Sequence, residues 1–195
     1  MRTLVEADIL KLRQSVEQGI QLRNAIALLG SGNMAGGIWR LYSDYYPKDG
    51  VTAWNIDSMW KSEWKNSTKD LNALGEDVFG NQLCFLRMKE NVFLWNHENG
   101  ETIDLGVDPI TMFEAIFKCG LKWIDFYDNG CISVAEKRIA DLPLQCHLHW
   151  TTPLILGGAV SLENTSIVER GAHLVGHAKL WGQIEDLPPG TIVIR

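Results

Sequence analysis

The stretch GEDVFGNQLCFL, from Gly75 to Leu86, lies where the composition of the chain changes. The text before it is charged and rich in tryptophan, and the text after it consists of short apolar runs separated by turn residues. Its two glycines predict a tight turn, and its last four residues predict the start of a buried strand. We expect Glu76 and Asp77 to remain open to solvent at this turn, where they are available to a partner.

Two apolar runs that follow, NQLCFLRM from Asn81 and NVFLWN from Asn91, predict strands. Their apolar residues occupy successive positions, which predicts that both faces of these strands are covered. The Asn-Gly pair at 99–100 is a strong hairpin signal, and it leads into a third strand around Ile103. We therefore predict an antiparallel meander near residues 81–106.

Helices are predicted on either side of this meander. Asp108 followed by Pro109 is typical of a helix start, with a capping residue and a first-turn proline, and apolar spacing extends the helical prediction over 109–128. Residues 1–70 are expected to form a helical N-terminal part that packs on a main domain at 71–195. The predicted class is α+β, with an antiparallel central sheet flanked by helices in one compact unit.

Composition limits the kind of protein this is. No segment is apolar for long enough to span a bilayer, and acidic residues interrupt the N-terminal apolar text, so we expect a cytoplasmic protein without membrane contact. Four widely spaced cysteines predict buried free thiols. Residues 71–195 hold nine Lys and Arg against sixteen Asp and Glu, which argues against a nucleic-acid partner and is compatible with a basic protein partner.

Four histidines form an arrangement that resembles a metal site. His147 and His149 share one side of the predicted strand CHLHW, and His173 and His177 lie at positions i and i+4 of a predicted helix, a spacing that suits zinc. The alternative, which we favour, is that backbone carbonyls or surface water satisfy these rings, so that no metal and no cofactor is bound. A metal-dependent enzyme built on these histidines is kept as an alternative function.

The sequence contains no specific catalytic motif. It has no G-x-S-x-G nucleophile elbow, and its cysteines lie in apolar text, which raises thiol pKa values. Glu98 and Glu101 flank an expected hairpin tip, where solvent leaves carboxylates as ordinary acids. We therefore expect a binding protein without catalytic residues.

Three segments, taken in order, resemble the SUKH superfamily. They are the acidic turn GEDVFG at 75–80, the strand text VFLWNHE at 92–98 and the helix text PITMFEAIFKC at 109–119. This superfamily includes fungal cell-wall-synthesis regulators of the SMI/KNR type and many bacterial immunity proteins. The tail, PLILGGAVSLEN with DLPPGT, is similar to that of immunity proteins with a GAD-like domain.

The resemblance implies a non-enzymatic α+β domain that neutralises a cognate bacterial toxin by protein–protein contact, as in a toxin–antitoxin pair. A basic nuclease is one candidate for the toxin, because it would suit an acidic protein electrostatically. A regulatory or scaffold protein of the SMI/KNR type is the alternative. Candidate partner-binding residues are the carboxylates at predicted turns and strand ends: Glu76, Asp77, Glu98, Glu101 and Asp104.

Overall fold

The structure is a computed structural model that describes residues 2–3, 6–17, 32–42, 51–56, 58–86, 89, 91–119 and 130–188. One seven-stranded sheet follows the chain order, and a separate two-stranded ribbon comes after it. The strands of the sheet are β1 (Arg2–Thr3), β2 (Gly32–Met34), β3 (Trp39–Leu41), β4 (Leu71–Asp77), β5 (Gln82–Leu86), β6 (Val92–Trp95) and β7 (Thr102–Asp104). The ribbon consists of β8 (Cys146–Trp150) and β9 (Thr165–Glu169).

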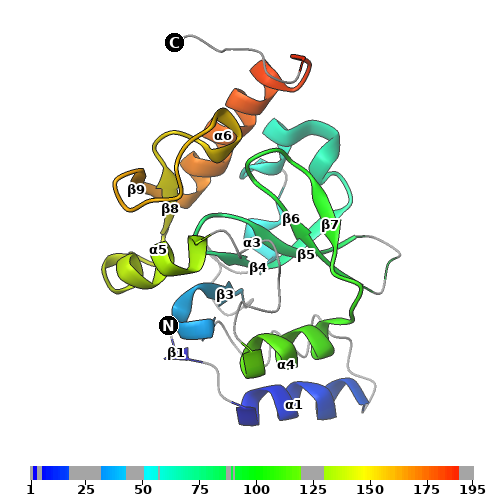
Figure 1. The fold of residues 1–195 in the computed structure, drawn as a ribbon. Helices are drawn as coiled ribbons and strands as arrows, with labels where there is room; N and C mark the ends of the chain where they lie inside the picture. Colours follow the sequence, from blue (N-terminus) through cyan, green and yellow to red (C-terminus); the bar gives the residue numbers. More distant parts are fainter. Residues whose placement is uncertain are drawn as a thin grey trace.

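Helices pack around this sheet. The α-helices are α1 (Glu6–Glu17), α3 (Val51–Trp54), α4 (Pro109–Cys119), α5 (Cys131–Arg138) and α6 (Arg170–Ile184). Short 3-10 segments are η1 (Ala35–Gly37), η2 (Lys61–Thr68), η5 (Ile139–Asp141) and η6 (Leu154–Leu156). Figure 1 shows α1 and α4 stacked on one side of the sheet, with α6 and the β8–β9 ribbon at the opposite end of the molecule. The predicted α+β class is confirmed.

The predicted meander is confirmed by the strand register. Leu83 of β5 pairs with Leu94 of β6, which pairs in turn with Ile103 of β7, and both pairings are antiparallel. Every other neighbouring pair in the sheet is also antiparallel except β1 with β2. The Asn-Gly signal at 99–100 falls in the β6–β7 turn, as expected.

Both faces of the sheet are covered, which explains the continuous apolar runs in its strands. On β6, Val92 and Leu94 point into one core with α4 and α5, whereas Phe93 and Trp95 point into a second core with η2 and α6. All four side chains are buried because a covered sheet leaves neither strand face to water. The prediction of a strand buried on both faces is therefore confirmed.

The first seventy residues contribute strands as well as helices. Trp39 of β3 pairs with Asp77 of β4, so the central sheet continues across residue 70. A purely helical N-terminal part is therefore an incomplete description. The predictions for 18–31, 121–128 and 189–195 lie outside the described residues.

Two further expectations concern thiols and membranes. The cysteines whose side chains the structure describes, Cys84, Cys131 and Cys146, are not disulfide-bonded. Within the described parts of the chain, no helix has the length and apolar character that crossing a membrane requires.

Glu76 and Asp77 are not open to solvent, which corrects the expectation for the acidic turn. Both side chains are 0% exposed, because β4 is an interior strand with β3 on one side and β5 on the other. Asp77 accepts hydrogen bonds from the backbone N–H groups of Phe79 and Asn81, which closes the turn. The two acidic residues of this turn therefore lie in the interior of the fold.

Candidate functional site

The five histidines of the chain come together in one buried cluster, which we call the histidine cluster: His97, His147, His149, His173 and His177. Ring centroids of neighbouring members lie 4.8 to 5.4 Å apart. Four of the rings are buried, and His149 is half-buried. A cluster of imidazoles from different elements is a candidate binding or catalytic site.

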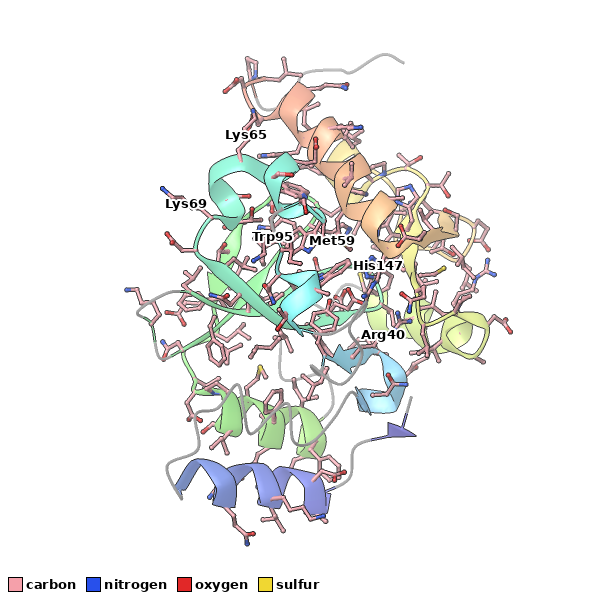
Figure 2. All side chains as sticks on the ribbon, turned by 180° about the vertical axis from the view of Figure 1, so that it is seen from behind. Arg40, Met59, Lys65, Lys69, Trp95 and His147 are labelled. Carbon is pink, nitrogen blue, oxygen red and sulfur yellow. The ribbon has the colours of Figure 1, made fainter. Side chains whose placement is uncertain are left out.

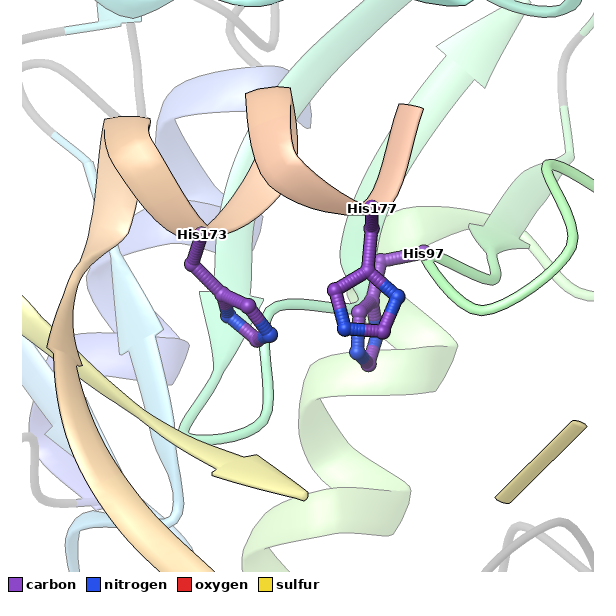
Figure 3. Close-up of side chains that lie close together, drawn as sticks. All are labelled: His97, His173 and His177. Carbon is purple, nitrogen blue, oxygen red and sulfur yellow. The ribbon is translucent and has the colours of Figure 1, made fainter. Parts of the chain in front are cut away.

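Three elements supply these rings. Strand β8 presents His147 and His149 on one side, as its alternation predicts, and α6 presents His173 and His177 from one face, as their i and i+4 spacing predicts. His97 follows β6 and lies beside His177 (Figure 3). The two predicted histidine pairs therefore meet in space, and a fifth ring joins them.

His97 is held in position by the acidic turn. Its Nδ1 lies 2.9 Å from Oδ1 of Asn81, whose Nδ2 donates a 2.7 Å hydrogen bond to Oδ2 of Asp77. Asp77 is the acceptor in this contact, so the amide nitrogen of Asn81 faces Asp77 and its carbonyl oxygen faces His97. A carbonyl oxygen only accepts, and therefore Nδ1 of His97 carries the proton and Nε2 carries the lone pair.

His147 is held by a second buried carboxylate, Glu76. Its Nε2 lies 2.9 Å from Oε2 of Glu76. Glu76 also accepts a 2.6 Å hydrogen bond from the hydroxyl of Tyr42 and a 3.2 Å contact from Arg170. Burial acts to raise the pKa of Glu76, but His147, Arg170 and Tyr42 together hold it below its usual range. Glu76 is therefore an ionised carboxylate in the interior.

Gly80 allows the rings to approach this turn. Its φ is +103°, a conformation that L side chains rarely adopt. A Cβ at this position would lie 3.0 Å from Nδ1 of His147 and 3.3 Å from Nδ1 of His173. The glycine therefore allows the backbone to turn and also lets the two rings pack against that turn.

Four of the five imidazole rings are uncharged, as a metal ligand must be. Burial, followed by repulsion from neighbouring imidazoles, lowers the pKa values of His97 and His173 well below 6.5. Burial, reinforced by His149 and His147, lowers the pKa of His177 to about 4, and burial also lowers that of His149. At neutral pH these four imidazoles are neutral, and each keeps one nitrogen lone pair.

A pocket of about 240 Å³ opens beside the cluster. His149, His173 and His177 line it together with residues of β9 and α6 such as Val168, Ala172 and Leu180. One ligand atom from each of His97, His173 and His177 lies within 4.8 Å of the others. Solvent and small ions therefore have a route to the edge of the cluster.

Glu98 is also part of this buried region, which corrects the expectation that it is a surface contact residue. Its side chain is 8% exposed, with Oε1 3.6 Å from Nε2 of His97 and Oε2 accepting from the N–H of Ile155. Burial raises the pKa of Glu98 to about 7. The turn after His97 folds back under η6, and this covers a carboxylate that a simple hairpin tip would expose.

Glu101 and Asp104 lie on the surface, as expected of contact residues. Asp104 accepts hydrogen bonds from the N–H of Gly106 and from the side chain of Asn91. Of the five candidate contact carboxylates, Glu76, Asp77 and Glu98 are buried, whereas Glu101 and Asp104 are exposed.

Comparison with known proteins adds information on the fold alone. No protein-family model and no curated protein matches the chain. Among solved structures, the crystal structure of Atu4351 from Agrobacterium tumefaciens matches with a TM-score of 0.50 and 14% sequence identity, covering 100% of this chain and 90% of that one. At this sequence identity the similarity concerns the arrangement of helices and strands, and no activity is inferred from it.

Proposed function

We propose that this chain is a non-enzymatic, immunity-type protein that neutralises a cognate bacterial toxin by direct contact. The observation that carries the proposal is the order of the three segments that resemble SUKH immunity proteins. In the fold these segments are the end of β4 with its turn, β6 with the turn that follows it, and α4, and all three contribute to one core. The three segments that carry the resemblance are thus neighbours in one core.

The charge distribution supports a basic partner. The carboxylate excess falls in residues 71–195, and the exposed Glu101 and Asp104 lie on the β6–β7 hairpin and β7. Exposed charges of this kind accelerate encounter with an oppositely charged protein and contribute less to the final affinity. We propose that these two carboxylates lie in the region that first meets the toxin.

Protection of cells is the direct test. Each candidate toxin domain taken from a gene adjacent to the one for this chain is expressed from an inducible promoter in a bacterial host, with and without this chain. We expect survival only when the chain is present, and formation of a complex between this chain and the inactivated toxin domain. Death of the host despite abundant folded chain would contradict the proposal.

A charge-reversal pair tests the proposed contact region. Glu101→Lys with Asp104→Lys should lower the association rate constant about 10-fold at low salt and weaken its dependence on ionic strength. The matched control is Glu136→Lys with Asp141→Lys, which changes the net charge equally at exposed positions on α5 and η5. Equal effects of the two pairs would remove the hairpin from the contact region.

A further inference from the structure

We propose that His97, His173 and His177 form a binding site for one divalent transition-metal ion of the zinc class, with Glu98 as the neighbouring fourth ligand. Imidazole nitrogen is a preferred ligand of zinc, copper and nickel, and a carboxylate oxygen completes many zinc sites. The site does not depend on the proposed toxin contact, and its test uses no toxin. Figure 3 shows the three rings converging from α6 and from the turn after β6.

The first argument is that the interior leaves these atoms without hydrogen bonds. Within the described parts of the chain, Nε2 of His97, Nε2 of His173, Nδ1 of His177 and Oε1 of Glu98 are buried and have no hydrogen-bond partner. All four residues are at most 8% exposed. Nε2 of His147 is a fifth such atom in this cluster, and it lies 2.9 Å from the carboxylate of Glu76. Buried polar atoms in folded proteins almost always have partners, so the other four require an explanation, and a shared cation is one.

The second argument is the tautomer of His97. Because Oδ1 of Asn81 accepts from Nδ1, the lone pair of the ring lies on Nε2, which is the atom that faces the cluster without a partner. Metal-bound histidines usually donate their second N–H to a carbonyl or carboxylate oxygen, which fixes the ring orientation. The Asp77–Asn81 pair gives His97 this arrangement.

The third argument is a similar relay to His173. The ionised Glu76 faces Nε2 of His147 at 2.9 Å, which favours a proton on that nitrogen. Nδ1 of His147 lies 3.1 Å from Nδ1 of His173, so one of these two nitrogens donates to the other. When Nδ1 of His173 is the donor, the lone pair of that ring is on its orphaned Nε2, and metal binding selects this tautomer.

His177 completes the set from the next turn of α6. Its Nε2 lies 3.4 Å from Nδ1 of His149, whereas its Nδ1 has no partner in the described structure. Oε1 of Glu98 lies 3.6 Å from Nε2 of His97, close to the separation of two ligands on one ion. Ligands of tetrahedral zinc lie about 3.4 Å apart, and one nitrogen of each of the three rings already lies within 4.8 Å of the others, so rotation of the rings can bring their lone pairs to a common ion.

The effect of such an ion follows from where its ligands lie. His97 belongs to the β6–β7 turn of the central sheet, and His173 and His177 belong to α6. A metal ion would therefore connect the C-terminal helix to the sheet and stabilise the folded state in proportion to its occupancy.

The test uses the full chain without a histidine tag, dialysed against a chelator and titrated with Zn²⁺ and, separately, Co²⁺. We expect one ion bound per chain, a higher midpoint of thermal unfolding with Zn²⁺, and the intense visible absorption of tetrahedral Co²⁺. A folded protein that shows no saturable binding of either ion would overturn the proposal, whatever the variants do.

Variants assign the ligands and the supporting residues. His177→Gln should lose the visible Co²⁺ bands, whereas the control His149→Gln, which changes a neighbouring ring outside the proposed set, should keep them. Asn81→Leu removes the partner of His97 and should weaken Zn²⁺ binding about 10- to 100-fold at unchanged stoichiometry. Circular dichroism checks that each variant is folded. Loss of binding in His149→Gln with retention in His177→Gln would contradict the assignment.

Discussion

At the scale of single residues, the acidic turn is a support for the histidine cluster. Glu76 contacts His147, Asp77 orients Asn81 toward His97, and Gly80 makes room for two rings. A buried carboxylate is costly unless charged and hydrogen-bonding partners surround it, and Arg170 and Tyr42 provide these for Glu76. The guanidinium of Arg170 is itself stacked on the ring of Trp54 at 4.1 Å.

Gly80→Ala should lower the free energy of unfolding by about 2 kcal/mol, because a Cβ there combines an unfavourable φ with close contact to His147 and His173. Chemical denaturation followed by tryptophan fluorescence measures this loss. NMR of the imidazole protons should also show shifted His147 and His173 signals.

The matched control is Gly157→Ala. Gly157 also has a positive φ, +85°, but a Cβ added there would have no neighbouring atom within 4 Å, so only the backbone cost of about 1 kcal/mol is expected. Equal losses in the two variants, with unchanged histidine signals, would show that the rings do not constrain Gly80.

At the scale of elements, local signals decide where α4 begins. Oδ1 of Asp108 accepts from the N–H groups of Ile110 and Thr111, and Pro109 occupies the first helical position, where no N–H is needed. Met112, Phe113 and Ile116 then enter the core beneath the sheet. The helix is thus fixed by its cap and by one apolar face.

Asp108→Ala should lower the free energy of unfolding by about 1 kcal/mol at neutral pH, through loss of the cap. Burial acts to raise the pKa of Asp108, but hydrogen bonds from Thr111 and Ile110 bring it below 3.8. The cap therefore contributes fully above pH 3.8, and its contribution is lost as the pH falls through the lower folded-state value.

Urea denaturation of wild type and variant at a series of pH values measures this difference. The gap between them should be constant above pH 3.8 and should shrink at more acidic pH. Asp70→Ala, at an exposed turn position, serves as the control with little effect. A gap that persisted unchanged at low pH would argue against an ionised cap.

At the scale of the whole molecule, the C-terminal part is anchored to the sheet at several points. Arg40 of β3 donates to the carbonyl oxygens of Leu144 and Cys146, and the N–H of Leu148 donates to the carbonyl of Val78. Figure 2, seen from behind, shows Arg40 and His147 where the sheet meets the C-terminal elements. Leu174 of α6 continues this attachment in the second core.

Leu174→Ala should lower the free energy of unfolding by about 3 kcal/mol, because a side chain that is 0% exposed leaves a cavity between α6 and the tryptophans of that core. Leu10→Ala is the matched control: this leucine also lies on a helix but is 51% exposed, so a change of about 0.5 kcal/mol or less is expected. Denaturation measures both, and similar losses would mean that α6 is weakly attached.

Much of the fold could be predicted because its signals are local. The Asn-Gly turn, the successive apolar residues of β5 and β6, the Asp108 cap and the spacing of the histidine pairs all depend on neighbours in the chain. Period-two alternation from Phe93 through Trp95 also points to His97, two residues beyond the strand. That alternation is the signal that could have placed the fifth ring on the face that α6 covers.

The sequence by itself determined the class of fold, the meander, α4 and the facing of each histidine pair. Only the tertiary structure decided that β3 extends the sheet past residue 70, that Glu76, Asp77 and Glu98 are buried, and that all five histidines meet. The reason is physical: periodicity and turn chemistry act over a few residues, whereas burial depends on which distant elements cover a position. The sequence around a charged turn residue is the same whether a distant helix covers that residue or it is exposed to water.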